Sequence, residues 1–273
     1  MKEMSLQDVQ SASLAILKNF HAFCVSHNIK YSLGYGSLIG AIRHKGFIPW
    51  DDDIDVVMMR EDFERFCNEY VDTTKYKLFS YSRNNTFSVV ARLCEMEKTY
   101  VNTATPLFIE KTGVWIDIFP LDSVDENKQN YEKVVANIEE INQQIFHCRW
   151  QMRRLDLKDI YKIRTFLSWL KNVRKARSSI NEILSKHNDL CIAYAGNESS
   201  VMSMLAFPAY LDRGFFPKRV FTDVENVLFE KEYFKAMKGY DEWLRIIYGD
   251  YMIVPPMEKQ QRRHSIHKYF WKD

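Results

Sequence analysis

The sequence contains no long uninterrupted run of apolar residues. A helix that spans a membrane needs roughly 18 such residues in a row, and no stretch of this chain approaches that length. Residues 4–27 are apolar on one face only and include Gln7, Asp8 and Lys18, so they lack the continuous apolar middle of a signal peptide. These absences exclude a membrane-spanning class and predict a cytoplasmic protein.

Cysteine, glycine and proline are sparse as well. The 5 cysteines of the 273-residue chain are scattered, and none forms a C-x-x-C pair, which fits neither a disulfide framework nor a thiolate metal site. We therefore interpret them as buried thiols. The chain has only 9 glycines and 7 prolines and no repeat or biased tract, which excludes collagen-like, disordered and solenoid classes.

A strong excess of one charge is also absent. The formal net charge is +2, which by itself predicts no polyanionic partner, and no nucleic-acid-binding motif accompanies it. The charges are unevenly distributed, because residues 51–72 are rich in Asp and Glu whereas residues 149–186 are rich in Lys and Arg. This pattern predicts a cation site in the first segment and an anion-facing surface in the second.

The spacing of apolar residues predicts an α/β fold. An amphipathic helix over 5–28, with Ser5 as its cap, precedes a short strand over 31–35 and a brief helix that ends near residue 44. Gly46 and Pro49 place residues 45–52 in a loop. We also expect a helix over 61–71 and strands over 53–58, 76–79, 88–94 and 114–119.

Residues 126–194 differ from the rest of the chain. They contain neither proline nor glycine, and their apolar residues recur at helical spacing, which predicts two or three long helices. Strand over part of 215–232 and a helix near 241–247 follow. We therefore predict a core over 1–125, a helical insertion over 126–195 and a C-terminal part, 196–273, that completes the core.

Paired aspartates are the clearest chemical feature of the sequence. Asp53 and Asp55 stand two apart on a predicted strand, so their side chains share one face while Ile54 and Val56 take the other. Such a pair suits a hard cation such as Mg²⁺, which takes oxygen ligands. Asp117 lies in an otherwise apolar strand, where an ionised carboxylate is costly unless paired or metal-bound, and we assign it to the same metal site.

Other interpretations of these acids remain open. Asp117 can instead be a core acid that pairs with an arginine, such as Arg92. A D-x-D pair also occurs in sugar-nucleotide glycosyltransferases. An EF-hand calcium loop is excluded, because its sixth position must be glycine and here is Val56.

A small-residue turn precedes the acids. Gly36 allows a close backbone approach, and Gly36-Ser37 opens a helix whose exposed N–H groups favour phosphate. Arg43, His44 and Lys45 add positive charge shortly afterwards, although cations at a helix end also suit the helix dipole without any ligand. The turn and the acids together predict a phosphate held beside a metal site.

Two flanking residues have both a functional and a structural interpretation. Trp50, next to the acids, either stacks on a base or ring or anchors its loop to the core. His264 lies in a basic C-terminal segment that we expect to face phosphate or acceptor, since zinc binding there lacks a third ligand.

The sequence resembles a known family. Residues 34–62, reading GYGSLIGAIRHKGFIPWDDDIDVVMMRED, resemble the signature of the LicD family, phosphocholine transferases related to fukutin within the polymerase-beta-like nucleotidyltransferase superfamily. Residues 115–122 (WIDIFPLD) and 248–256 (YGDYMIVPP) resemble its downstream blocks. The resemblance is dense over the first 122 residues and the last 60 or so, and weak through the helical insertion.

The resemblance implies a fold, a reaction and a set of roles. The fold is a nucleotidyltransferase core with a mixed sheet flanked by helices. The reaction moves a phospho-alcohol, most often phosphocholine, from a CDP-activated donor to a hydroxyl of a cell-surface glycan or its lipid-linked precursor, with two Mg²⁺ or Mn²⁺ ions. Asp53 and Asp55 then ligate the metal on the donor phosphate, and Asp117 completes the site and accepts the acceptor's proton. A catalytically inactive, glycan-binding member is the alternative.

The basic part of the insertion has two interpretations. Charge runs of this kind are usually solvated helix faces. The functional interpretation is attraction to an anionic membrane surface, which brings the protein to the inner face of the membrane as a peripheral protein.

Overall fold

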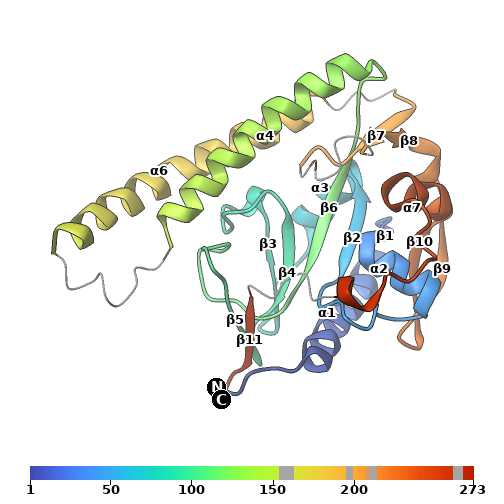
Figure 1. The fold of residues 1–273 in the computed structure, drawn as a ribbon, viewed down its shortest axis with the longest axis horizontal. Coiled ribbons are helices and arrows are strands. Elements are labelled where there is room, and N and C mark those ends of the chain that lie inside the picture. The colour runs from blue at the N-terminus through green and yellow to red at the C-terminus, as the bar shows by residue number, and fades with distance from the viewer. Residues whose placement is uncertain (154–162, 195–198, 207, 209–213, 261–266) are drawn as a thin grey trace.

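A mixed sheet assembled from distant parts of the chain forms the centre of the fold (Figure 1). The computed structural model describes residues 1–153, 163–194, 199–206, 208, 214–260 and 267–273. Five strands run across the sheet in the order β1 (Ser32–Leu33), β2 (Asp55–Met59), β6 (Trp115–Ser123), β4 (Ala91–Glu95) and β3 (Tyr76–Phe79). β2 and β6 pair in parallel, and the other neighbours are antiparallel.

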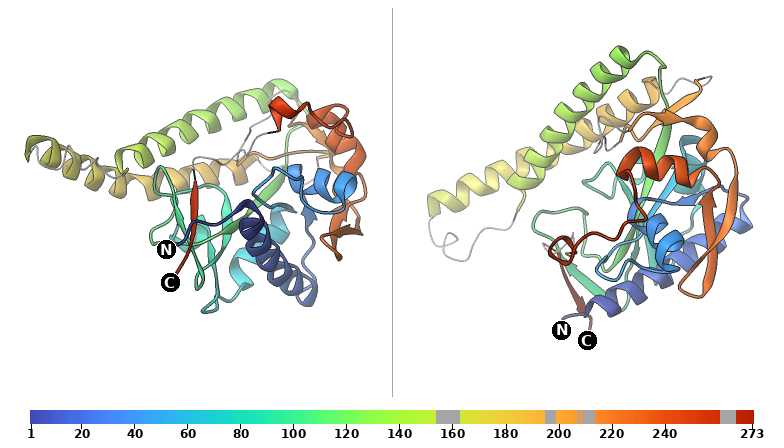
Figure 2. Two further views of the ribbon diagram at one scale, coloured as in Figure 1. Left: turned by 60° about the horizontal axis from the view of Figure 1, so that its bottom comes forward. Right: turned by 45° about the vertical axis from the view of Figure 1, so that its right-hand side comes forward.

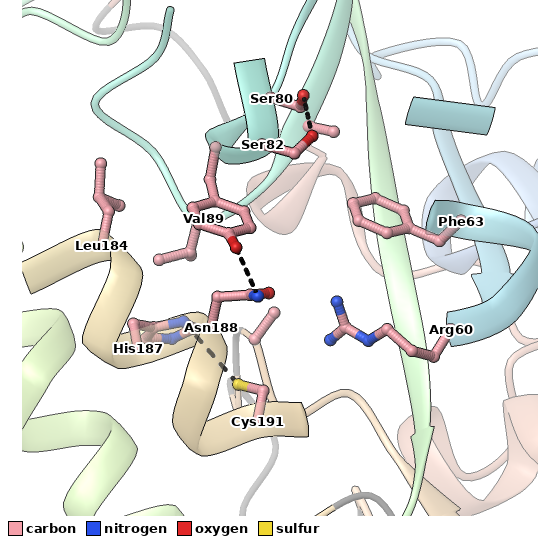
Figure 3. A pocket seen from close by; sticks show the side chains of 12 residues that line it. Arg60, Phe63, Ser80, Ser82, Val89, Leu184, His187, Asn188 and Cys191 are labelled. Carbon is pink, nitrogen blue, oxygen red and sulfur yellow. Dashed lines mark hydrogen bonds between the residues drawn. The ribbon is translucent and has the colours of Figure 1, made fainter. Parts of the chain in front are cut away.

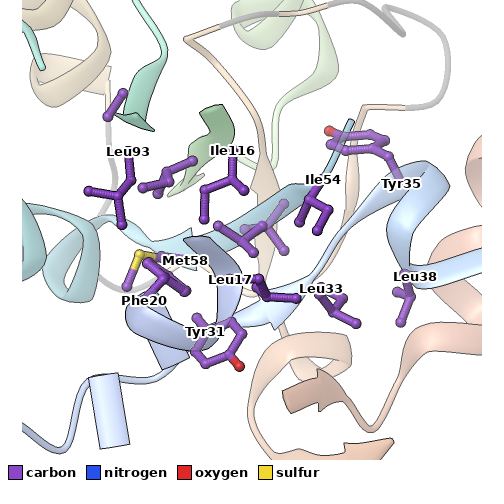
Figure 4. Close-up of a cluster of buried hydrophobic side chains, with 14 of the residues drawn as sticks. Leu17, Phe20, Tyr31, Leu33, Tyr35, Leu38, Ile54, Met58, Leu93 and Ile116 are labelled. Carbon is purple, nitrogen blue, oxygen red and sulfur yellow. The ribbon is translucent and has the colours of Figure 1, made fainter. Parts of the chain in front are cut away.

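The first helix covers the apolar side of this sheet. α1 (Leu6–Ser26) begins with a capping box, in which the Ser5 hydroxyl accepts from the Asp8 N–H and the Asp8 carboxylate accepts from the Ser5 N–H. α1 packs on β4 and β6, and α3 (Arg60–Glu69) packs on β2 and β6. Figure 4 shows Leu17 and Phe20 of α1 in one cluster with side chains from β1, β2, β4 and β6.

The predicted brief helix near residue 44 is confirmed, with a change of type inside it. α2 (Tyr35–Ile39) continues into a π-helical turn, Gly40–His44. Lys45 takes a left-handed backbone conformation, with a φ of 60°, and ends the turn. The segment therefore leaves α2 sharply and enters the loop that carries the acids.

Two long helices form a hairpin that extends beyond the sheet. α4 (Lys128–Gln151) and α6 (Ile163–Tyr194) lie side by side in every view of Figures 1 and 2. Ile145 and Ile180 form a small apolar cluster between the helices and Phe87 of the core. The long helices predicted for this segment are confirmed, while the three-part division of the chain stays a prediction.

The C-terminal part adds short strands around the core. β7 (Val201–Ser203) pairs with β6, and β8 (Phe216–Pro217) pairs with β7. The remaining elements are the hairpin of β9 (Val224–Phe229) and β10 (Glu232–Met237), helix α7 (Tyr240–Tyr248), the pair of β5 (Thr99–Asn102) and β11 (Lys268–Trp271), and single 3₁₀ turns at Tyr81–Arg83, Lys218–Phe221 and Met257–Lys259. The two ends of the chain lie together (Figure 1), where the Trp271 N–H donates to the Lys2 carbonyl at 2.8 Å.

Three predictions made from the sequence can be compared with the structure: the fold class, the state of the cysteines and the lack of a membrane-spanning helix. The mixed sheet flanked by helices confirms the predicted fold class. All five cysteines are buried and free, and burial raises the pKa of the Cys67 thiol to about 12. In the described part of the chain, no helix has both the length and the apolar character that a bilayer crossing requires.

Candidate functional site

Strand register places the acids of two distant segments side by side. Asp55 on β2 is the register partner of Asp117 on β6, and Asp117 is in turn the partner of Arg92 on β4. Neighbouring strands lie roughly 4.8 Å apart, and side chains of paired residues project to the same face. The three charged residues therefore form one row across the centre of the sheet, on the face opposite Ile54 and Val56.

Asp117 is buried and held by two groups. Its Oδ1 lies 2.7 Å from Arg92 Nε, and its Oδ2 accepts a hydrogen bond of 3.1 Å from Trp115 Nε1. Arg92 also donates to Ser88 Oγ at 2.6 Å, and its guanidinium lies 5.6 Å from the Trp115 ring centroid, within the range of a cation–π contact. The structure thus contains the Arg92 pairing weighed above, and a further role of Asp117 as metal ligand stays a prediction.

The loop before β2 gathers three carboxylates. One oxygen from each of Asp51, Asp52 and Asp53 lies within 4.8 Å of the others, and within the described ranges this is the group whose spacing suits a metal ion. It shares only Asp53 with the predicted trio of Asp53, Asp55 and Asp117. Carboxylate oxygens are the ligands that Mg²⁺ and Mn²⁺ accept, so the donor set fits the predicted metal.

The glycine-serine turn touches both groups of acids. A Cβ built on Gly36 would lie 2.5 Å from Asp51 Oδ2, so only glycine allows this approach. Ser37 Oγ accepts the Asp55 N–H at 2.9 Å, which leaves the hydroxyl proton available to a ligand oxygen. Tyr35 has a φ of +44°, an uncommon conformation for a bulky residue and one that clusters at functional sites.

The predicted phosphate-binding cations have structural partners. Arg43 Nη1 donates to the carbonyls of Tyr251 at 2.5 Å and Ile253 at 3.2 Å, and Arg43 Nε donates to His44 Nε2 at 2.9 Å. Burial lowers the pKa of Arg43, while burial and the Arg43 charge lower the pKa of His44. The Lys45 carbonyl accepts the Glu230 N–H at 2.9 Å. This segment therefore ties the α2 turn to the C-terminal part.

Of the two flanking residues predicted to serve the site, Trp50 and His264, the structure describes Trp50. Trp50 is half-buried, and its ring centroid lies 6.4 Å from that of His44 in an edge-on contact, so the tryptophan stands between the acidic loop and the Arg43 segment. His264 lies outside the described residues. His267 is described, and its ring lies 5.5 Å from that of Trp115, which donates to Asp117.

Three features of the structure were missed from the sequence. Asp51 and Asp52 belong to the run DDD, which signals a cluster but not which members converge. His267 approaches the site only through the β5–β11 pairing, which no local pattern indicates. Arg60 pairs with the fully buried Asp122, through bonds of 2.7 and 2.9 Å, although Asp122 stands in the WIDIFPLD segment quoted above.

A separate small cavity lies between α3, the 3₁₀ turn near residue 81 and α6 (Figure 3). Arg60, His187 and Asn188 line it, and its volume of about 10 Å³ is no larger than the space that one water needs. Burial lowers the pKa of His187 to about 4. Ala91 also lines the cavity, whereas the next residue, Arg92, faces the row of acids. The cavity is therefore on the other side of β4 from the candidate site.

Two comparisons with known proteins identify the family to which this chain is similar. A family model described as LicD/FKTN/FKRP, nucleotidyltransferase domain, matches residues 28–146, which include the glycine-serine turn, the acids of residues 51–55 and Asp117. The protein of Haemophilus influenzae named lipopolysaccharide cholinephosphotransferase LicD is 32% identical over 274 residues, covering 98% of this chain and 99% of that protein.

Two shorter matches are to uncharacterised proteins. One, from Rickettsia typhi, is 40% identical over 63 residues, which are 23% of this chain and 20% of that protein. The other, from Rickettsia prowazekii, is 47% identical over 47 residues, or 17% and 18% of the two chains. Because the similarity to the Haemophilus protein extends over nearly the full length of both, this chain belongs to the LicD family.

Proposed function

We propose that this protein transfers phosphocholine from CDP-choline to a hydroxyl group of a cell-surface glycan, such as lipopolysaccharide, or of its lipid-linked precursor. The observation that supports this most is the near full-length similarity to a protein named lipopolysaccharide cholinephosphotransferase. The geometry agrees with it, because a glycine-serine turn that can approach a phosphate lies beside carboxylates that can bind the accompanying metal ion.

The side chains of this site have distinct tasks in the proposed reaction. The Ser37 hydroxyl and the first N–H groups of α2 bind the donor pyrophosphate. Asp53 and Asp55, with Asp51 and Asp52 beside them, hold Mg²⁺ or Mn²⁺, which when bound neutralises phosphate charge and polarises the bond to be broken. Most of the rate enhancement comes from holding the donor phosphate and the acceptor hydroxyl in line, since phosphoryl transfer requires little covalent chemistry from the protein.

The bond changes balance without any further reactant. The acceptor oxygen attacks the phosphorus that carries choline, the new O–P bond forms, and the bond to cytidine monophosphate breaks. The proton of the acceptor hydroxyl passes to a carboxylate of the row, where Asp55 and Asp117 stand side by side. Arg92 and Trp115 keep the Asp117 carboxylate in a fixed orientation.

The test is release of cytidine monophosphate from CDP-choline by the variants Asp53→Asn and Asp55→Asn. Each is expected to lose at least about 100-fold in turnover while its circular dichroism and melting stay unchanged, because amides keep the shape but not the charge. Asp189→Asn, an exposed change on α6, is the matched control. Chelation of divalent metal should abolish release, and Mg²⁺ should restore it; unchanged release in either site variant contradicts the proposal.

A panel of donors separates the remaining alternatives. CDP-choline is compared with CDP-ethanolamine, CDP-glycerol and CDP-ribitol, because the alcohol depends on pocket shape rather than on the acids. Release of UDP from a UDP-sugar, with no release from any CDP-alcohol, would assign the D-x-D pair to a glycosyltransferase. Glycan binding without release from any donor would identify an inactive member of the family.

A further inference from the structure

The end of the α4–α6 hairpin exposes a group of large apolar side chains. The exposed fractions are 58% for Phe146 and 49% for Trp150 on α4, and 72% for Ile163 and 57% for Leu167 on α6. Single exposed apolar residues are common, whereas several at one end of a projecting hairpin indicate an interaction surface. Figures 1 and 2 show this end of the hairpin standing clear of the sheet and of both chain termini.

Contacts within the hairpin hold the aromatic rings of this end in place. Phe146 and Trp150 stack with their centroids 6.2 Å apart, and Phe166 and Trp169 stack at 6.0 Å. Trp169 Nε1 donates to the Arg153 carbonyl at 2.9 Å, and the Arg153 guanidinium lies 4.2 Å from the Trp150 centroid. An open groove of about 490 Å³ separates the two helices here. The rings are therefore fixed on the surface.

Among the described residues, the charged side chains of the hairpin end that carries this aromatic group are all basic. The described residues of the hairpin end, 146–153 and 163–177, include no aspartate or glutamate. They do include several basic residues: Arg149, Arg153, Arg164, Lys171, Arg174, Lys175 and Arg177. In the sequence, Asp156 and Asp159 lie between these two described ranges, and within α6 acids return at Glu182 and Asp189, nearer the sheet. Aromatic rings beside basic side chains, with no acid among these described residues, form a surface that complements an anionic, partly apolar partner.

We propose that this hairpin end docks on the surface of an anionic lipid bilayer. Tryptophan rings favour the level of the lipid headgroups, and Lys and Arg side chains around them attract anionic headgroups. A second copy of the chain is a poorer occupant, because a symmetric dimer would place two cationic patches against each other. The inference goes beyond the proposed reaction, and its test needs neither donor nor acceptor.

The test is sedimentation of the full-length protein with lipid vesicles. The protein should pellet with vesicles that contain phosphatidylglycerol and remain in solution with pure phosphatidylcholine, and added salt should weaken the binding. Tryptophan fluorescence should shift to shorter wavelength only with the anionic vesicles, because the exposed Trp150 leaves water. Equal binding to both vesicle types, or to neither, overturns the proposal.

Two double variants and two matched controls assign any binding to the hairpin end. Lys171→Glu with Lys175→Glu should weaken binding at least about tenfold, since each basic residue near the surface contributes measurably. Trp150→Ser with Leu167→Ser should remove the fluorescence shift. Lys231→Glu with Lys238→Glu, and Val71→Ser with Met257→Ser, change exposed residues elsewhere and should bind as the wild type does.

The remaining outcomes also decide the question. Vesicle binding by the hairpin variants that equals that of the wild type overturns the proposal. So does a wild-type dimer in size-exclusion chromatography that Trp150→Ser with Leu167→Ser converts to a monomer without any vesicle binding, because the patch then belongs to a second copy. Unchanged circular dichroism of each variant shows that lost binding is not lost folding.

Discussion

Gly36 is the residue through which the α2 turn contacts the acidic loop. The variant Gly36→Ala adds a Cβ 2.5 Å from Asp51 Oδ2, so the carboxylate must move. We expect turnover to fall more than about tenfold, since small displacements of a site are costly. Stability should change little, because alanine gains about 1 kcal/mol in helix propensity. Release of cytidine monophosphate and urea unfolding measure the two effects.

A neighbouring glycine provides the control for this prediction. A Cβ on Gly40 would meet the backbone carbonyl of Gly46 rather than a movable side chain. Gly40→Ala should therefore lower the free energy of unfolding as well as turnover. Equal loss of stability in the two variants would show that Gly36 serves the fold and not the site.

The Arg92–Asp117 pair allows stability to be separated from activity. Arg92→Met leaves the Asp117 carboxylate buried without its cation, which should lower the free energy of unfolding by about 3 to 5 kcal/mol. The double variant Arg92→Met with Asp117→Leu should regain most of that stability, yet remain inactive. Urea unfolding of both variants checks this, and a double variant as unstable as the single one contradicts it.

The chemistry of single residues could be predicted better than their partners. Asp117 stands out in the sequence because an acid interrupts an apolar strand, but its contact with Arg92 depends on the register of β6 against β4. Arg43 has the charge expected of a phosphate ligand, yet its guanidinium donates to carbonyls of residues 251 and 253, which only the folded chain brings near.

Secondary structure elements with a long apolar pattern could be predicted closely from the sequence. α1, α3, α4, α6 and α7 lie where periodicity placed them, and β3 has the predicted bounds. Of the missed strands, β10 forms a hairpin with its neighbour β9, whereas the others are short and pair with distant segments: β5 with β11, and β7 with β6. Strands this short are too brief to show an alternation of apolar and polar residues, so their extended conformation depends on pairing with the partner strand.

His187 should make the packing of α6 on the core sensitive to acid. Burial lowers the pKa of His187 from 6.5 to about 4, so between these values the unfolded chain binds the additional proton and stability falls as the pH drops. A pKa shift of this size changes the free energy of unfolding by about 3 kcal/mol at most. His187→Gln should lose less stability than the wild type between neutral pH and about pH 4.5.

Urea unfolding at the two pH values measures this, with His147→Gln as the control. His147 lies exposed on α4, so its replacement should leave the acid sensitivity unchanged. A His187→Gln protein that loses as much stability as the wild type on acidification would assign the effect to other groups. The cavity in Figure 3 places His187 near Arg60, whose charge also lowers the pKa of the histidine.

The fold brings the parts of the candidate site together from segments that are far apart in the chain. The α2 turn and the acidic loop come from the first quarter, Asp117 from the middle, and His267 beside Trp115 from the end. The hairpin of α4 and α6 projects away from this assembly (Figure 2). The proposed chemistry at the sheet and the proposed docking through the hairpin should therefore be separable, so that variants of one leave the other intact.

Arg43 links the first and last parts of this assembly. Its guanidinium holds the carbonyls of Tyr251 and Ile253 against the π-helical turn, and hydrogen bonds from a charged donor contribute about 1.5 to 3 kcal/mol each. Arg43→Gln should therefore lower the free energy of unfolding, and Arg43→Lys should lower it less. If the guanidinium serves this contact alone, the KM for CDP-choline should change less than about threefold in both variants. Steady-state kinetics beside urea unfolding decide between the two roles, because a KM that rises while stability is kept would assign Arg43 to the donor phosphate instead.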